Sequence, residues 1–128
     1  DALLLFRPEP LLKAIASEAL RKIGIFTEQN LANTAWAFAK LLFSDPPLID
    51  AISDAALARI GQFFPQALAN LAWSLANQQV QNPTLMQSIS AQSIAIMAQF
   101  NHQNISNLVW ALATLGIFDD PLLNAISC

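Results

Sequence analysis

The chain has 128 residues, of which 55% are hydrophobic and 12% are charged, with a formal net charge of −3. This length predicts one compact domain or a short repeat array, and low charge combined with high hydrophobicity excludes intrinsic disorder. A single cysteine, Cys128, excludes a disulfide scaffold and a cysteine-rich metal site. No apolar run reaches the ~18 residues that a membrane span needs, and no signal peptide is expected.

Apolar residues at helical spacing predict pairs of helices along the whole chain. Residues 2–6 match the tail of a first helix, and residues 10–26 match a second helix, which Gly24 is expected to end. Further helices are predicted at about 28–42, 65–79 and 102–115, each followed by a partner helix that begins near residues 46, 83 and 121.

Most of these helices carry a start signal in the sequence. Thr27 and Asn101 are good N-cap residues, and Pro65 suits the first position of a helix. The partner helices follow Asp45-Pro46, Asn82-Pro83 and Asp120-Pro121, in each case a cap residue before a proline. Gly61 is expected to end the second partner helix as Gly24 ends the first, whereas the third copy has Ala98 at that position.

The helix pairs repeat every 37 residues. The positions that recur without a gap include Trp36, Trp73 and Trp110; Phe26, Phe63 and Phe100; Gln29, Gln66 and Gln103; and Asn33, Asn70 and Asn107. Such a period predicts an all-α fold, an α-solenoid of helix–turn–helix repeats that is expected to form a right-handed superhelix. We expect one array over residues 1–128, with a partial repeat at 1–26, repeats at 27–63 and 64–100, and a truncated repeat at 101–128, cut from a longer protein.

The first helix of each repeat has two distinct faces. Leu31, Phe38 and Leu42 cluster on one side of the helical wheel and are predicted to pack on the partner helix. The opposite side forms a predicted ligand-facing ribbon, which consists of Gln29, Asn33, Lys40, Gln66, Asn70, Asn77, Gln103, Asn107 and Thr114 beside the tryptophans.

Two interpretations of the tryptophans remain open. Trp36, Trp73 and Trp110 can pack between neighbouring repeats together with Phe26, Phe63 and Phe100, where the small alanines around each indole let the helices approach. The indoles can instead face a ligand, as stacking platforms for bases or as anchors for a protein. The repeated asparagines divide in the same way, between tying repeats together and binding a ligand.

Nothing in the sequence predicts catalysis. His102 is the only histidine and falls in the first turn of a helix, where an exposed or capping role is expected. Cys128 has no base to activate it as a nucleophile, and no residues show metal-ligand spacing. We therefore expect no enzyme activity, no catalytic residue, no cofactor and no metal.

The segments "PQALANLAWSLANQ" and "HQNISNLVWALATLGIFDDPLLNAI" resemble the octotricopeptide (OPR) repeat family, and the resemblance covers essentially the whole chain. Related helical repeats occur in FAST-kinase-like proteins with a RAP domain, although no RAP domain is visible here. The resemblance implies an α-solenoid in an organelle, a plastid or a mitochondrion, where such proteins bind RNA and support its processing, stability or translation.

Charge argues against a simple RNA-binding interpretation. Residues 60–128 contain no Lys or Arg, and Lys40 is the only cation of the predicted ribbon, whereas RNA affinity depends on cations that neutralise phosphates. The favoured hypothesis is a structural subunit that packs against protein in a large organellar assembly, for which a membrane-associated complex is one candidate. The alternative is part of an array that binds single-stranded RNA, with its basic repeats outside this sequence.

Overall fold

The computed structural model describes residues 8–116 and 120–127, and these residues are helical with short connections and no strand. The α-helices are α2 (Glu9–Lys22), α3 (Glu28–Lys40), α4 (Pro46–Ala58), α5 (Pro65–Asn77), α6 (Pro83–Ala95), α7 (His102–Leu115) and α8 (Asp120–Ser127). Three short 3-10 helices, η1 (Ile23–Ile25), η2 (Ile60–Gln62) and η3 (Met97–Gln99), follow α2, α4 and α6. The predicted all-α class is confirmed for the described residues.

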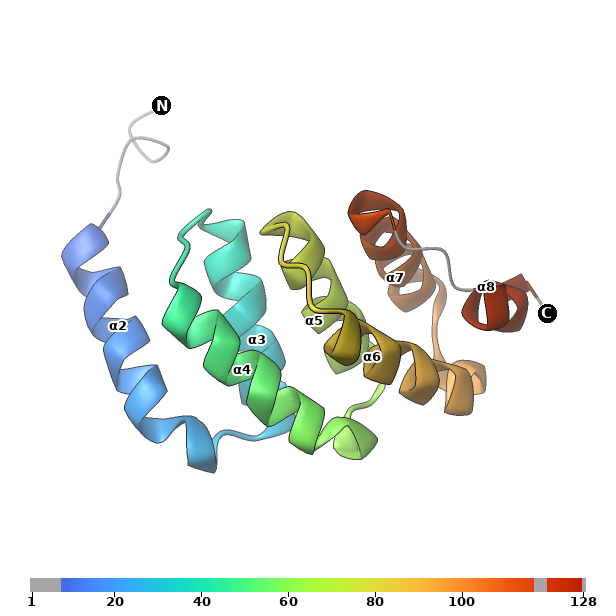
Figure 1. The fold of residues 1–128 in the computed structure, drawn as a ribbon, viewed down its shortest axis with the longest axis horizontal. Coiled ribbons are helices and arrows are strands. Elements are labelled where there is room, and N and C mark those ends of the chain that lie inside the picture. The colour runs from blue at the N-terminus through green and yellow to red at the C-terminus, as the bar shows by residue number, and fades with distance from the viewer. Residues whose placement is uncertain (1–7, 117–119, 128) are drawn as a thin grey trace.

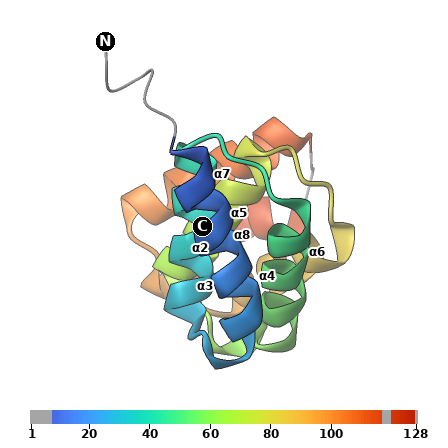
Figure 2. The ribbon, with the colours of Figure 1, turned by 90° about the vertical axis from the view of Figure 1, so that its left-hand side faces the viewer.

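The helices form two rows. In the first, which we call the A row, α5 packs between α3 and α7; in the second, the B row, α2, α4, α6 and α8 pack one against the next. Figure 1 shows the helix pairs side by side in chain order, with α2 at one end and α8 at the other. Seen along the rows in Figure 2, α3 lies on one side and α4 and α6 lie on the other.

Five start signals act as predicted, whereas Asp120, predicted to cap the last helix, lies inside α8. The side chains of Thr27 and Asn101 accept hydrogen bonds from the backbone N–H groups of Asn30 and Asn104, at 3.1 and 2.7 Å. The side chain of Asp45 caps α4 by accepting from the backbone N–H of Leu48, and that of Asn82 caps α6 by accepting from Leu85, both at 3.1 Å. Pro65 is the first residue of α5. These starts are local, because each depends only on residues within one helical turn.

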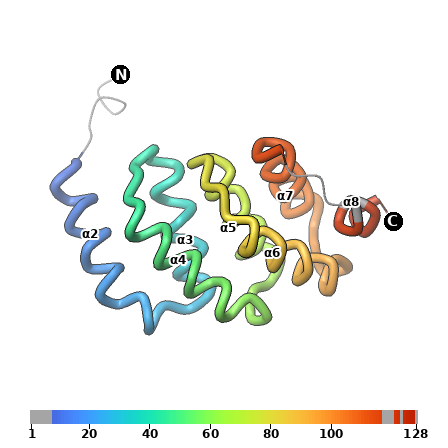
Figure 3. The backbone as a smooth tube through the Cα atoms, viewed as in Figure 1, coloured from blue at the N-terminus to red at the C-terminus, as the bar shows by residue number. Residues whose placement is uncertain are grey.

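The ends of the B-row helices differ from the prediction. Gly24 and Gly61 do not serve as left-handed caps; each lies inside a 3-10 turn, after an α-helix that ends at Lys22 or Ala58. The third copy forms the same turn around Ala98, so this turn does not require glycine. The tube in Figure 3 shows how these turns lead the chain back from the B row to the A row.

Leu42 also differs from the prediction. The helix that was expected to reach residue 42 ends at Lys40, and Leu42 takes a left-handed conformation with φ of 54°. The equivalent Gln79 and Gly116 have φ of 56° and 69°. The amide of Phe43 then donates to the carbonyl of Phe38 at 3.1 Å, which is the Schellman pattern of a helix end. Leu42 is therefore turned away from the core and is 73% exposed.

A continuous core fills the space between the two rows. It includes Leu31 and Phe38 as predicted, and the repeated leucine and isoleucine positions of the B row are equally buried. Leu48, Ile52, Leu85 and Ile89 are at most 2% exposed. In α2, the equivalent Leu11 and Ile15 are 57% and 44% exposed. The difference arises because α4 and α6 each have a B-row neighbour on both sides, whereas α2 has α4 on one side only within the described residues.

Polar side chains join successive helix pairs. A guanidinium nitrogen of Arg59 donates to the carbonyl of Phe26, and Nε2 of Gln92 donates to the carbonyl of Phe63 at 3.1 Å. Phe26 and Phe63 occupy the same place in consecutive repeats, so both bonds satisfy the same carbonyl. These bonds link the end of α4 to the chain after α2, and α6 to the chain after α4.

No helix among the described residues is long and apolar enough to cross a membrane. The predicted helix tail at residues 2–6 and the thiol of Cys128 lie outside the described residues.

Candidate functional site

The three tryptophans form a ladder across the A row. The ring centroids of Trp36 and Trp73 are 6.4 Å apart with planes tilted by 40°, and those of Trp73 and Trp110 are 5.7 Å apart with planes at 28°. Each ring comes from a different helix, so the ladder runs from α3 through α5 to α7. We call these three residues the indole ladder.

The helix spacing that permits the ladder comes from small side chains. Ala32, Ala35, Ala69 and Ala72 flank the rings and are at most 1% exposed. Side chains of this size let neighbouring helices approach at the short end of the usual 8–10 Å range. The ring contacts agree with packing between repeats, and presentation to a ligand stays a prediction. Trp73 contacts the indoles on both sides of it, and Trp36 and Trp110 remain exposed at the two ends.

The ladder is open to solvent along one edge. Trp36 is 41% exposed and Trp110 is 42% exposed, while Trp73 between them is partly buried. Two exposed indoles joined through a partly buried third form a contiguous aromatic surface, which is unusual for a face that meets only water.

Lys40 lies against this surface. Its Nζ is 5.5 Å from the ring centroid of Trp36 and 5.7 Å from that of Trp73, within the range of cation–π attraction. Lys40 thus lies over the first two rings of the indole ladder, those of Trp36 and Trp73. The attraction of its ammonium to these rings is present before any ligand binds.

The predicted amides border the ladder in pairs. Nε2 of Gln29 donates to Oδ1 of Asn33 at 2.9 Å, and Nε2 of Gln103 donates to Oδ1 of Asn107 at 3.0 Å. Both bonds lie within one helix, between residues four positions apart, so they do not tie one repeat to the next. Each pair keeps its remaining amide donors and acceptors at the surface.

The other residues of the predicted ribbon differ in their exposure. Gln66 is exposed and Asn70 is partly buried, at the positions of the other two amide pairs. Thr114 is exposed near the end of α7, whereas Asn77 is partly buried at the end of α5. The side-chain carbonyl oxygen of Asn77 is buried and has no hydrogen-bond partner among the described residues.

Some residues of this surface were not predicted from the sequence. Leu41 and Leu42, directly after α3, are 48% and 73% exposed. Nε2 of Gln78 reaches the carbonyl of Phe43 at 3.5 Å and so connects the end of α5 to the turn after α3. The repeat pattern did not predict these exposed leucines, because it placed Leu42 on the face that packs on the partner helix.

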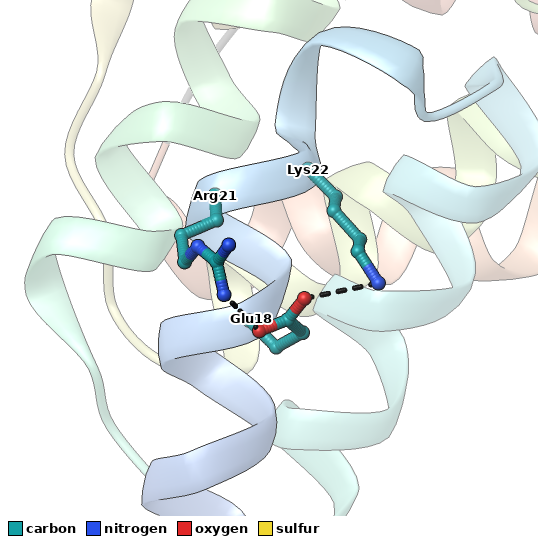
Figure 4. Close-up of polar contacts among 3 residues, drawn as sticks. All are labelled: Glu18, Arg21 and Lys22. Atoms are coloured by element: carbon teal, nitrogen blue, oxygen red, sulfur yellow. Dashed lines mark hydrogen bonds and ion pairs between the residues drawn. The ribbon is translucent and has the colours of Figure 1, made fainter.

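The other described cations lie away from the ladder. Arg21 and Lys22 both pair with Glu18 on α2, at 2.8 and 2.9 Å, as Figure 4 shows. Arg59 is engaged by the carbonyl of Phe26, and Lys13 is exposed on α2. The surface around the indole ladder is therefore aromatic and amide-rich, with Lys40 as its one described cation.

His102 is exposed in the first turn of α7, and it belongs to no cluster of metal-ligating side chains among the residues described. Its position agrees with the exposed role expected for it.

Two comparisons bear on the family of this chain. No curated protein sequence matches it significantly. A family model, described as RNA-editing substrate-binding complex 6 protein (RESC6), matches residues 2–128. This match spans nearly the whole sequence, including every helix described above, and on that basis the chain belongs to the RNA-editing substrate-binding complex 6 protein family.

Proposed function

We propose that this chain is a non-catalytic α-solenoid scaffold that binds protein as a subunit of an RNA-editing substrate-binding assembly. The solenoid is proposed to consist of 37-residue helix–turn–helix repeats with a right-handed superhelix, which is the arrangement that the octotricopeptide resemblance implies. Membership of the RESC6 family supports a place in such an assembly. An organellar location follows from the same family, and we expect it to be mitochondrial.

The observation that carries the proposal is the indole ladder. Tryptophan is enriched in the residues that dominate binding energy at protein interfaces, and charged residues are depleted at the cores of those interfaces. The ladder places three indoles in one line over α3, α5 and α7, with uncharged amides beside them. A protein partner can bury the exposed edges of the rings and pair with the free amide groups in a single contact.

Single-stranded RNA is the second candidate, and Lys40 is the observation that favours it. Its ammonium lies over two indoles, and single-strand-binding proteins combine positive charge with aromatic platforms for bases. Two other features weigh against this candidate. A base inserted between two indoles needs about 7 Å between their planes, twice the ~3.4 Å rise of stacked bases, and the rings already contact each other. One cation also neutralises few phosphates.

The test uses the tagged full-length protein purified with its assembly from the cells that make it. Trp36→Ala and Trp110→Ala remove exposed indoles at the two ends of the ladder, and each is expected to weaken retention of other subunits by about 2 kcal/mol or more. Ile94→Ala is the matched control, because Ile94 has a similar exposure of 37% but lies on α6 in the other row. Circular dichroism checks that each variant remains folded.

Treatment with ribonuclease separates the two candidates. If the subunits stay bound after ribonuclease in the wild type and leave in the tryptophan variants, the protein-binding function is supported. Retention of every subunit by both tryptophan variants would contradict it. Loss of the subunits on ribonuclease treatment of the wild type would instead favour the RNA candidate.

A further inference from the structure

Lys40 is a positive charge that no carboxylate compensates within the described part of the chain. The ion pairs on α2 use Glu18 with other cations, and Lys40 belongs to no ion pair or hydrogen bond among the described residues. Lys40 is exposed, and its Nζ lies 5.5 and 5.7 Å from the ring centroids of Trp36 and Trp73. An ammonium has three hydrogen-bond donors, and these remain available to an anionic group.

The rings favour one position of this ammonium, near one end of the indole ladder. A lysine side chain at a surface samples many rotamers, and attraction to two indoles selects among them. The equivalent residues of the next two repeats are Asn77 and Thr114, which carry no charge. Among the described residues, the ladder therefore has one cation, which lies over Trp36 and Trp73, and none over Trp110.

One cation for three rings fits a protein segment better than a nucleic acid. Every nucleotide of a single strand carries a phosphate charge, so an RNA laid along the ladder would bring further charges to Asn77 and Thr114, which cannot neutralise them. A charge that loses water without gaining an ion pair is costly. A protein segment can carry one carboxylate between apolar side chains, which matches one ammonium beside uncharged indoles.

A hydrogen-bond donor lies on the same face of α3. Asn33, Trp36 and Lys40 are separated by three and then four residues, so they follow one another along the helix over about 10 Å. Oδ1 of Asn33 accepts from Gln29 at 2.9 Å, whereas its amide nitrogen donates to no described residue. This face of α3 therefore presents a donor, an indole and an ammonium in that order.

We propose that the indole ladder binds a protein segment whose carboxylate pairs with Lys40. An apolar side chain next to this carboxylate covers the exposed part of Trp36, and a carbonyl of the segment accepts from the amide nitrogen of Asn33. The carboxylate belongs to an Asp or Glu of another subunit. The inference rests on the proposed function and names the chemistry of the partner that the ladder takes.

The first experiment measures subunit retention over a series of salt concentrations, with the tagged full-length protein purified with its assembly. Lys40→Gln is expected to weaken retention of one subunit by about fivefold at low salt, the upper end for an exposed ion pair, and to remove most of the salt dependence. Lys40→Arg keeps the charge and the attraction to the rings, so it is expected to retain the subunit.

Lys13→Gln is the matched control, because it removes an exposed cation from α2 in the other row. It is expected to behave as the wild type. Equal retention by Lys40→Gln and the wild type would overturn the proposal. An equal loss in Lys13→Gln would also overturn it, since that result would show a general effect of net charge.

The second experiment identifies the carboxylate. A water-soluble carbodiimide condenses a carboxylate with an amine in contact with it, with loss of water, and leaves no spacer between them. A cross-linked peptide that joins Lys40 to an Asp or Glu of another subunit supports the proposal. The pair of Lys22 and Glu18, whose Nζ and Oε2 are 2.9 Å apart, is the internal positive control. If this control cross-link forms and Lys40 joins no other subunit, the proposal is wrong. Release of the subunit by ribonuclease would assign Lys40 to RNA instead.

Failure of this inference can be told apart from failure of the proposed function. If Trp36→Ala and Trp110→Ala release subunits and Lys40→Gln does not, the scaffold function stands and the carboxylate partner is rejected. If none of the three variants releases any subunit, both are rejected. Circular dichroism of Lys40→Gln checks that it remains folded, so that a loss of retention reports binding.

Discussion

Phe64 stands at the N-cap position of α5, where the other helices of the A row have Thr27 and Asn101. Thr27 and Asn101 both form capping boxes with the asparagine three residues later, whereas Phe64 provides no side-chain cap and is 56% exposed. The start of α5 therefore depends on Pro65, whose fixed φ suits a first helical position and whose missing N–H needs no acceptor.

Phe64→Asn is expected to stabilise the chain by about 1 kcal/mol, because its side-chain oxygen would accept from the free backbone N–H of Ala67. Thr27→Ala, the matched reverse change, is expected to destabilise by a similar amount, since it removes the 3.1 Å bond to the amide of Asn30. Urea unfolding followed by circular dichroism measures both effects. Equal midpoints for Phe64→Asn and the wild type would show that Pro65 alone sets the helix start.

The beginnings of most helices were predictable from the sequence, whereas among the ends the prediction matched α7, which stops at Leu115, and missed those of α3 and α5 by two residues. The start of a helix depends on two or three adjacent residues, such as Asp45 and Pro46, whose effect does not require contacts elsewhere in the fold. The end of α3 depends on whether the chain can turn at Leu42, and this turn forms although leucine disfavours its conformation. Periodicity assigned Leu42 to the core because it continues the spacing of Leu31 and Phe38.

The polar links between repeats were missed for a related reason. Arg59 and Gln92 satisfy equivalent carbonyls, yet they are 33 residues apart rather than 37. Their positions in the repeat differ by four residues, with Gln92 inside α6 and Arg59 directly after α4. A search for identical residues at the repeat period overlooks this substitution.

Small residues set the distance between the helices of the A row. Enlarging a buried alanine there is therefore expected to destabilise the fold. Ala76 on α5 is fully buried, and its equivalent on α7, Ala113, is exposed. Ala76→Leu is expected to destabilise by about 1–3 kcal/mol, because the added atoms force α5 away from its neighbours. Ala113→Leu, which inserts the same atoms at an open position, is expected to change stability by less than about 0.5 kcal/mol.

Thermal unfolding of both variants checks this contact, and tryptophan fluorescence adds a second measurement. Separation of the helices would also change the stacking of Trp73 on Trp110, so the emission of Ala76→Leu is expected to differ from the wild type below the transition. Similar stabilities for Ala76→Leu and Ala113→Leu would mean that the A row tolerates wider spacing, and that the alanines are not what holds the indole ladder together.

The chain carries little charge, and most of the cations among its described residues are engaged. Within the described residues, Arg21 and Lys22 pair with Glu18, Arg59 binds a backbone carbonyl, and Lys40 lies over two rings. The asymmetry of Lys and Arg along the chain was visible in the sequence. The partner of each Lys or Arg depends on the fold. These contacts reduce the number of cations that remain to bind a polyanion.

This distribution predicts how the chain responds to single-stranded RNA in a salt series. For single strands, the logarithm of the affinity falls with the logarithm of salt by about 0.7 for each phosphate that is neutralised. With Lys40 as the one described cation beside the indole ladder, a slope of magnitude about 1 or less is expected, together with weak binding at physiological salt. Quenching of tryptophan emission by an RNA oligonucleotide measures both quantities, and Lys40→Gln is expected to bring the slope close to zero. A slope of about 3 or more would require several cations to converge on one strand, which the described arrangement of Lys13, Lys40 and the Glu18 pairs does not provide, and it would favour RNA over protein as the ligand of this family member.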